Sequence, residues 1–401
     1  MRTRNMTAGS PSRLIFTIAM PLMVGNIFQQ LYTVVDAQVV GMVEGVGALA
    51  ALGAADWFNW MFLGIIQGFT QGFAIPVAQR FGADDHEGMR RYVGNAVTLA
   101  VILAVILTIT AISLIVPVLT ILDTKPEILP IAQDYLIVLF AGIPIVMAYN
   151  LMAGILRALG DGKSPLYAMI IASLINVTLD ILFVAKFGWG VTGAAAATLI
   201  GQAFSSVYCF IRLRGLEFMR IDKSDLKPSG IISKRLIFLG IPIAAQNGII
   251  AVGGMVVQSI VNKMEIAFIA GYTATNKMYG LLEIAALSYG YAVSTYAGQN
   301  LGAKEYDRIH KGVHSSAIIG VLTSCAIAGC MFVAGEMILG GFVSSEDPLE
   351  AALAVRYGKE FLNLMSLWLP VLYILHIYRS ALQGMGNTVM PMTSGREEGL
   401  M

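Results

Sequence analysis

The stretch AGIPIVMAYNLMAGILRALGDGKSP, residues 141–165, returns later in the chain as SLWLPVLYILHIYRSALQGMGNTVMP, residues 366–391. In both copies a long apolar run leads into a short segment that contains glycine. The two copies align Pro144 with Pro370, Gly160 with Gly386 and Pro165 with Pro391. Internal similarity of this kind indicates that the chain is built from two related halves.

Two further pairs of segments support the repeat. IAMPLMVGN (18–26) resembles FLGIPIAAQN (238–247), and PVAQRFGADD (76–85) resembles TYAGQNLGAK (295–304). The copies in all three pairs are 220–226 residues apart and lie on equivalent sides of the apolar segments. The sequence therefore predicts a parallel repeat of six-span units. Such repeats build transporters with a central cavity between two lobes.

The composition is that of a membrane protein. Of 401 residues, 57% are hydrophobic and only 13% are charged, against about 25% charged in soluble domains. Apolar stretches of 18 or more residues recur, which predicts an all-α membrane protein and not a barrel of short alternating strands. A net charge of +1 gives no sign of a nucleic-acid partner. We expect spans at about 14–43, 48–79, 92–122, 130–156, 165–186, 191–212, 235–262, 266–299, 312–343 and 355–382.

Basic residues predict the orientation. Eighteen of the 26 Lys and Arg residues flank the same ends of the expected spans as the N-terminus, and only Lys125, Lys186, Lys263, Arg356 and Lys359 flank the opposite ends. The positive-inside rule places the N-terminus in the cytoplasm of a multi-pass protein of the plasma (inner) membrane. The polar segment 213–234 is then a cytoplasmic linker. We expect an N-terminal lobe (1–222, spans 1–6) and an incomplete C-terminal lobe (223–401, spans 7–10).

Several motifs resemble those of the multidrug and toxic compound extrusion (MATE) transporter family. They are the two Q-x-x-G-A motifs (AQRFGA and GQNLGA), the R-A-L-G-D-x-x-x-P loop, and N-x-x-x-D followed by G-V-x-G-A-A-x-A-T. The resemblance covers residues 10–391. It implies twelve spans in two six-helix lobes and cation-coupled efflux of organic, often cationic, compounds. Only about ten spans are present here, because the two that the repeat predicts do not follow Pro391.

Two carboxylates within the apolar segments indicate a functional site, because a charge at mid-bilayer costs at least a few kcal/mol. Asp36 and Asp180 lie about 12 and 9 Å from their outer loops at 1.5 Å per residue, and Thr198 lies at a similar depth. Asn176 shares a helix face with Asp180, four residues away. We expect these four residues to converge in the first lobe as a site for Na⁺ or H⁺. The resemblance implies the same cation site. The alternative is that Asp180 merely bonds to a neighbouring helix.

Two polar stripes are candidates for lining the substrate cavity. The first segment carries Gln29, Tyr32 and Asp36 on one face, and the eighth carries Tyr272, Asn276, Tyr279 and Glu283. An acidic, aromatic stripe attracts organic cations through charge and cation–π contacts. A polar contact between the lobes explains the second stripe equally well.

The function expected from these features is cation-coupled antiport of organic, cationic drugs or metabolites. We expect no enzymatic activity and no cofactor, and a monomer in the bilayer with a small organic substrate as partner. One alternative is a flippase for lipid-linked precursors, although the cavity charges Asp36, Asp180 and Glu283 are acidic and a pyrophosphate headgroup requires basic ones. The other alternative is an inactive remnant. Because spans 11 and 12 are missing from the repeat, we expect this product to be impaired as an exporter.

Overall fold

The computed structural model describes residues 5–222, 224–261, 263–342 and 348–398, and every regular element in these ranges is helical. The first half contains α1 (Pro11–Glu44), α2 (Val46–Gly82), α3 (His86–Ile121), α4 (Leu129–Ala141), α5 (Ile143–Ala158), α6 (Lys163–Asp180), the π-helix η1 (Ile181–Lys186) and α7 (Gly190–Arg214). The 3₁₀-helix η2 (Glu217–Met219) lies in the segment that links the halves, and the second half contains α8 (Gly230–Val261), α9 (Ile266–Gly302), α10 (Tyr306–Phe342), α11 (Pro348–Gly384) and α12 (Val389–Glu398).

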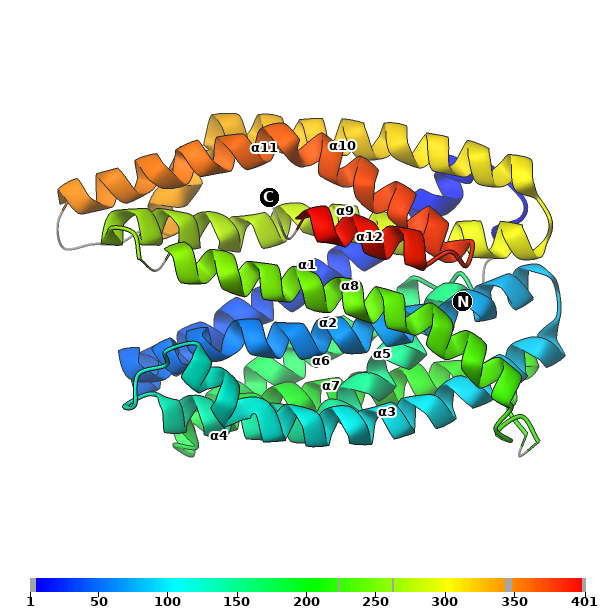
Figure 1. Cartoon of the computed structure of the whole chain (residues 1–401), viewed down its shortest axis with the longest axis horizontal. Coiled ribbons are helices and arrows are strands. Elements are labelled where there is room, and N and C mark those ends of the chain that lie inside the picture. The colour runs from blue at the N-terminus through cyan, green and yellow to red at the C-terminus, as the bar shows by residue number, and fades with distance from the viewer. Residues whose placement is uncertain (1–4, 223, 262, 343–347, 399–401) are drawn as a thin grey trace.

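The long helices run side by side in two layers along the long axis of the molecule (Figure 1). The lower layer holds α3 to α7, the upper layer holds α9 to α11, and α1, α2 and α8 lie between them. The buried core is divided accordingly into two large clusters. The second cluster also includes Met6 and buried residues of α1 between 14 and 22. Since α1 thus packs in both clusters, the exact lobe boundary at 222/223 stays a prediction.

The observed helices match the predicted spans with two differences. Eight helices in the described ranges are long and apolar enough to cross a membrane, and α4 with α5 makes a ninth span bent by 48°. The expected span 130–156 is therefore broken beside Gly142, where Pro144 lies in the first turn of α5. The remaining expected span, 266–299, forms the 37-residue helix α9, which carries Lys277 and Glu283 and is not among these helices. Residues 262 and 343, at the ends of two expected spans, lie outside the described residues.

The predicted repeat is visible in the backbone. Gly160 and Gly386 both have positive φ, 76° and 91°, which glycine adopts without strain. The residues that follow these glycines, Asp161 and Asn387, each cap the next helix with a side-chain oxygen. Asp161 Oδ1 accepts the N–H of Ser164 at 2.9 Å, and Asn387 Oδ1 accepts the N–H of Met390 at 3.2 Å. The parallel repeat is confirmed, and α12 occupies the place in the second half that α6 has in the first.

A ridge of small residues joins the two halves. Gly64, Gly68 and Gly72 follow one face of α2 and face α8. A Cβ at Gly72 would lie 2.6 Å from the Cα of Gly240, and one at Gly68 would fall on the backbone of Ala244. The two backbones approach this closely because no side chain separates them.

Candidate cation site

Four residues predicted to form one site lie on three adjacent helices. Asp36 is on α1, Asn176 and Asp180 are on α6, and Thr198 is on α7. The side chains of Asp36, Asn176 and Asp180 are buried, with relative exposures of 6%, 1% and 0%. Both carboxylates are thus enclosed within the layer of first-half helices and do not face lipid.

Asn176 links Asp180 to Thr198. Only one orientation of its amide satisfies both ends of the group. In this orientation the nitrogen donates to Asp180 Oδ2 at 3.2 Å, and the oxygen accepts from the hydroxyl and the backbone N–H of Thr198 at 3.2 and 3.3 Å. The predicted convergence of these three residues is present in the structure.

One oxygen of each carboxylate has no hydrogen-bond partner among the described residues. These atoms are Asp36 Oδ1 and Asp180 Oδ1, and both are buried. Because α1 packs against α6, Asp36 and Asp180 lie close enough for their charges to repel each other. A buried unpaired carboxylate is costly, and it is stabilised when it takes up a proton or binds a cation. The atoms of these four side chains that could coordinate a cation are oxygens. Oxygen ligands fit a hard cation such as Na⁺, and the carboxylates can equally take up H⁺.

The helix geometry changes directly after Asp180. The α-helix α6 ends at this residue and continues as the π-helix η1. π-helical turns are rare and are often found at functional sites. The wider turn follows the carboxylate immediately, so this part of α6 is packed differently from a regular span. The apolar sequence ILFVAK gives no sign of it.

Sequence analysis missed three polar residues around this site. Tyr135 of α4 is buried and interacts electrostatically with both Asp36 and Asp180. Gln202 lies one turn after Thr198 on α7, and its buried Oε1 has no hydrogen-bond partner within the part of the chain that the structure describes. Asp56 of α2 acts electrostatically on Asp36. Asp56 could have been found by the criterion that selected Asp36, because it is a carboxylate within the expected span 48–79.

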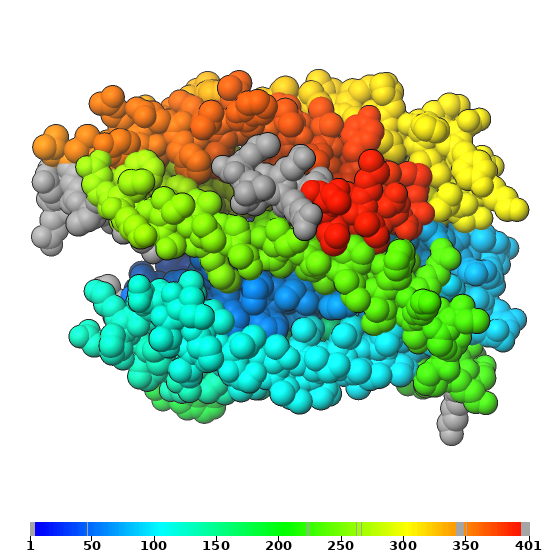
Figure 2. Space-filling view, viewed as in Figure 1, coloured from blue at the N-terminus to red at the C-terminus, as the bar shows by residue number. Residues whose placement is uncertain are grey.

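Asp56 borders the space between the two halves. Its side chain is exposed, and the charge that acts on it comes from the exposed Lys277 of α9, in the other half. Gln29 is exposed and Tyr32 is half-buried on α1. Figure 2 shows the surface hollowed between the halves at the end where α4 begins. Water or a ligand that enters between the halves therefore meets charged groups from both of them.

The predicted stripe on α9 is only partly available to this space. Asn276 and Tyr279 are half-buried. Glu283 contacts His376 of α11, with Oε1 and Nε2 3.3 Å apart. Because α11 belongs to the same half, Glu283 interacts within its own half of the molecule. His376 was not among the predicted site residues, since nothing in the sequence pairs it with a residue on another helix.

The fold and these sites together define a helical multi-pass membrane transporter. The MatE family model matches residues 21–182 and 242–394, and the chain belongs to this family. The two matches begin at Pro21 and Pro242, the prolines that the repeat aligns.

Similar proteins support this assignment. The chain is 27% identical to "Probable multidrug resistance protein YpnP" of Bacillus subtilis, over 96% of this chain and 85% of that protein. It is 24% identical to "Probable multidrug resistance protein NorM" of Thermotoga maritima, over 94% and 81%. A solved structure of a MOP superfamily transporter from Pyrococcus furiosus superimposes with a TM-score of 0.92 at 23% identity, covering 99% of this chain and 87% of that one.

Proposed function

We propose that this chain is an antiporter that exports organic cations in exchange for Na⁺ or H⁺. Asp36, Asn176, Asp180 and Thr198 form its coupling site. The observation that carries the proposal is the pair of buried carboxylate oxygens, Asp36 Oδ1 and Asp180 Oδ1, that find no hydrogen-bond partner in the described ranges. In the interior of a membrane protein such a pair is costly to maintain unless it binds and releases a cation.

The substrate cavity lies between the halves and is acidic on the first-half side. Asp56 and Asp36 supply negative charge, and Gln29 and Tyr32 of α1 line the approach. From the second half, the half-buried Asn276 and Tyr279 of α9 border the cavity, and Glu283 reaches it only if its contact with His376 opens. Carboxylates together with aromatic rings favour organic cations through charge and cation–π attraction. The relatives named for multidrug resistance fit this substrate class.

The coupling site can influence both halves through α1. Asp36 lies in the part of α1 that packs against the first half, whereas residues 14–22 of the same helix belong to the core of the second half. A cation that draws Asp36 toward Asp180 therefore acts on a helix that both halves share. The excess of basic residues supports a cytoplasmic N-terminus and a cytoplasmic linker 213–234. We propose that the protein works as a monomer in the plasma (inner) membrane.

Transport by the purified chain in lipid vesicles tests the exchange. With the membrane potential clamped by potassium and valinomycin, we expect ethidium to accumulate when the lumen is acidic or rich in Na⁺, and not without an ion gradient. Dissipating the gradient should stop accumulation, and Glu127→Gln, which removes an exposed carboxylate from the loop before α4, should behave as wild type. Protein-dependent flux of ethidium and other organic cations that neither gradient drives would contradict antiport.

A further inference from the structure

The two Q-x-x-G-A motifs meet where α2 and α9 end. A Cβ on Gly82 would fall on the carbonyl oxygen of Gln299, and a Cβ on Gly302 would fall on that of Gln79. The residues that follow share a further feature, since Asp84 and Lys304 both have positive φ, 58° and 61°. Two segments from different halves are thus in direct backbone contact in a nearly symmetric arrangement.

Each glutamine of these motifs donates a hydrogen bond to the opposite half. Gln79 Nε2 donates to the carbonyl of Gly384 at the end of α11, at 3.1 Å. Gln299 Nε2 donates to the carbonyl of Ala158 at the end of α5, at 2.7 Å. The acceptors are related by the same repeat as the donors, because 158 and 384 are as far apart as Pro144 and Pro370. The two bonds therefore cross the boundary between the halves in both directions.

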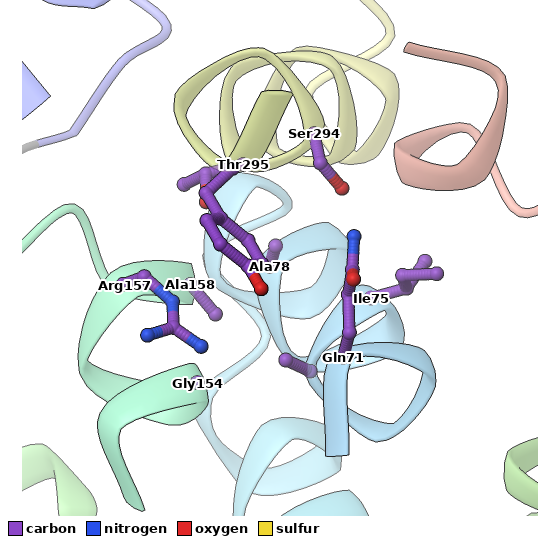
Figure 3. A pocket seen from close by; sticks show the side chains of 10 residues that line it. Gln71, Ile75, Ala78, Gly154, Arg157, Ala158, Ser294 and Thr295 are labelled. Carbon is purple, nitrogen blue, oxygen red and sulfur yellow. The ribbon is translucent and has the colours of Figure 1, made fainter. Parts of the chain in front are cut away.

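Other contacts between the halves surround the two glutamines. The guanidinium of Arg157 on α5 lies over the ring of Tyr291 on α9, 4.6 Å from its centre. A small pocket beside them is lined by side chains of α2, α5 and α9, including Gln71, Arg157 and Ser294 (Figure 3). Because these groups come from both halves, they have to separate if this end of the molecule opens.

The N-terminal segment, residues 5–9, holds only one of the two glutamines. The N–H of Met6 donates to Gln299 Oε1 at 2.8 Å, and the Met6 side chain is fully buried. Arg308 of α10 donates to the carbonyls of Met6 and Gly9 at 3.2 and 3.0 Å and fixes the segment to the second half. Both ends of the Gln299 amide are therefore occupied, one by the N-terminal segment and the other by Ala158.

We propose that Gln79 and Gln299 form a two-part latch that keeps the α2–α9 end of the transporter closed, and that residues 5–9 strengthen it by orienting the Gln299 amide. The inference rests on the proposed function in one respect, that alternating access requires this end to open. Both glutamines are positioning residues, since neither touches the cation site. Opening then breaks both bonds. The Gln299 amide oxygen accepts from Met6 at 2.8 Å, whereas the Gln79 amide oxygen accepts from Arg235 of α8 at the longer distance of 3.5 Å.

Distances between spin labels test the latch without transport. We place labels at Glu87 on α3 and Lys311 on α10, two exposed positions on different halves, with Cys209, Cys325 and Cys330 replaced by alanine. Wild type is expected to show mainly one short distance. Gln79→Ala and Gln299→Ala should each raise the ratio of long to short distances roughly fivefold, the factor expected for one typical hydrogen bond.

The role of the N-terminal segment is tested by Met6→Pro, which removes the N–H donated to Gln299, with Met6→Leu as the control that keeps it. Met6→Pro alone should raise the ratio of long to short distances. Combined with Gln299→Ala it should raise the ratio no further than Gln299→Ala alone, whereas combined with Gln79→Ala it should raise the ratio above that of Gln79→Ala alone. Met6→Leu should match wild type. Equal distances in Met6→Pro and Met6→Leu would overturn the role of the segment.

A second pair of variants guards against loss of folding. Gln79→Met and Gln299→Met keep the approximate size of each side chain without adding a charge, and they remove the donor to the opposite half. Both should open the latch as alanine does, and wild-type distances in both would overturn the proposal. Because the labels are read without substrate or ion gradient, a protein that proves uncoupled can still show the latch, and a coupled protein can still lack it.

Discussion

Asp180→Asn is expected to reduce gradient-driven ethidium transport to the level of vesicles without protein. The amide has the same size as the carboxylate and can still accept the hydrogen bond from Asn176, which is 3.2 Å long in the structure. It can neither take up a proton nor balance the charge of a bound cation. Asp36→Asn should have the same effect, because its unpaired oxygen is the second charged group of the site.

Matched variants separate loss of charge from loss of structure. Glu127→Gln should transport as wild type, because it removes an exposed loop carboxylate that is not among the residues of the coupling site. Thr198→Ser should keep most activity and Thr198→Val should lose much of it, since only serine retains the hydroxyl that contacts Asn176. All variants should elute as monodisperse protein after purification. Normal gradient-driven transport by either aspartate variant would show that the coupling lies elsewhere.

Gly68→Leu is expected to destabilise the protein severely. An added Cβ falls on the backbone of Ala244 in α8, which cannot move aside as a flexible side chain could. Overpacking of this kind costs about 1–3 kcal/mol, or more where backbone must shift. The α2–α8 contact joins the halves, so its disruption should lower both the yield of folded protein and its melting temperature.

Gly53→Leu is the control for this prediction. Gly53 lies on the same helix, but a Cβ there has no atom within 4 Å. Both substitutions change helix propensity equally, so that only the contact with α8 distinguishes them. Gly53→Leu should melt within a few degrees of wild type. Equal stability of the two variants in a thermal unfolding assay would show that the glycine ridge does not join the halves.

Much of the fold was predictable because its signals are local or repeated. Long apolar segments indicated the spans, and the repeated prolines and glycines indicated two related halves. The repeat did not reveal that the first turns of α1 pack into the second core cluster, because this depends on how the halves are placed in space. The bend between α4 and α5 does have a sequence signal, because Pro144 lies within the expected span 130–156 directly after the break.

The site was predictable to the extent that its residues carry a local signal. Asp36 and Asp180 stand out as charges in apolar segments, and Asn176 shares a helix face with Asp180. Glu283 was predicted to line the substrate cavity, which stays a prediction, and its contact with His376 joins two helices far apart in the chain. The π-helix after Asp180 arises from packing and has no sequence signature that we recognise.

Cation binding by the purified protein tests the central claim most directly. Bound ²²Na⁺ is measured by equilibrium dialysis and released H⁺ by a pH indicator in weak buffer, before and after addition of ethidium. The wild-type protein is expected to bind one of these cations and to release it when ethidium binds, whereas Asp36→Asn and Asp180→Asn should show neither signal. Unchanged cation binding and release in the Asp36→Asn, Asp180→Asn double variant would contradict the assignment of this site as the coupling site.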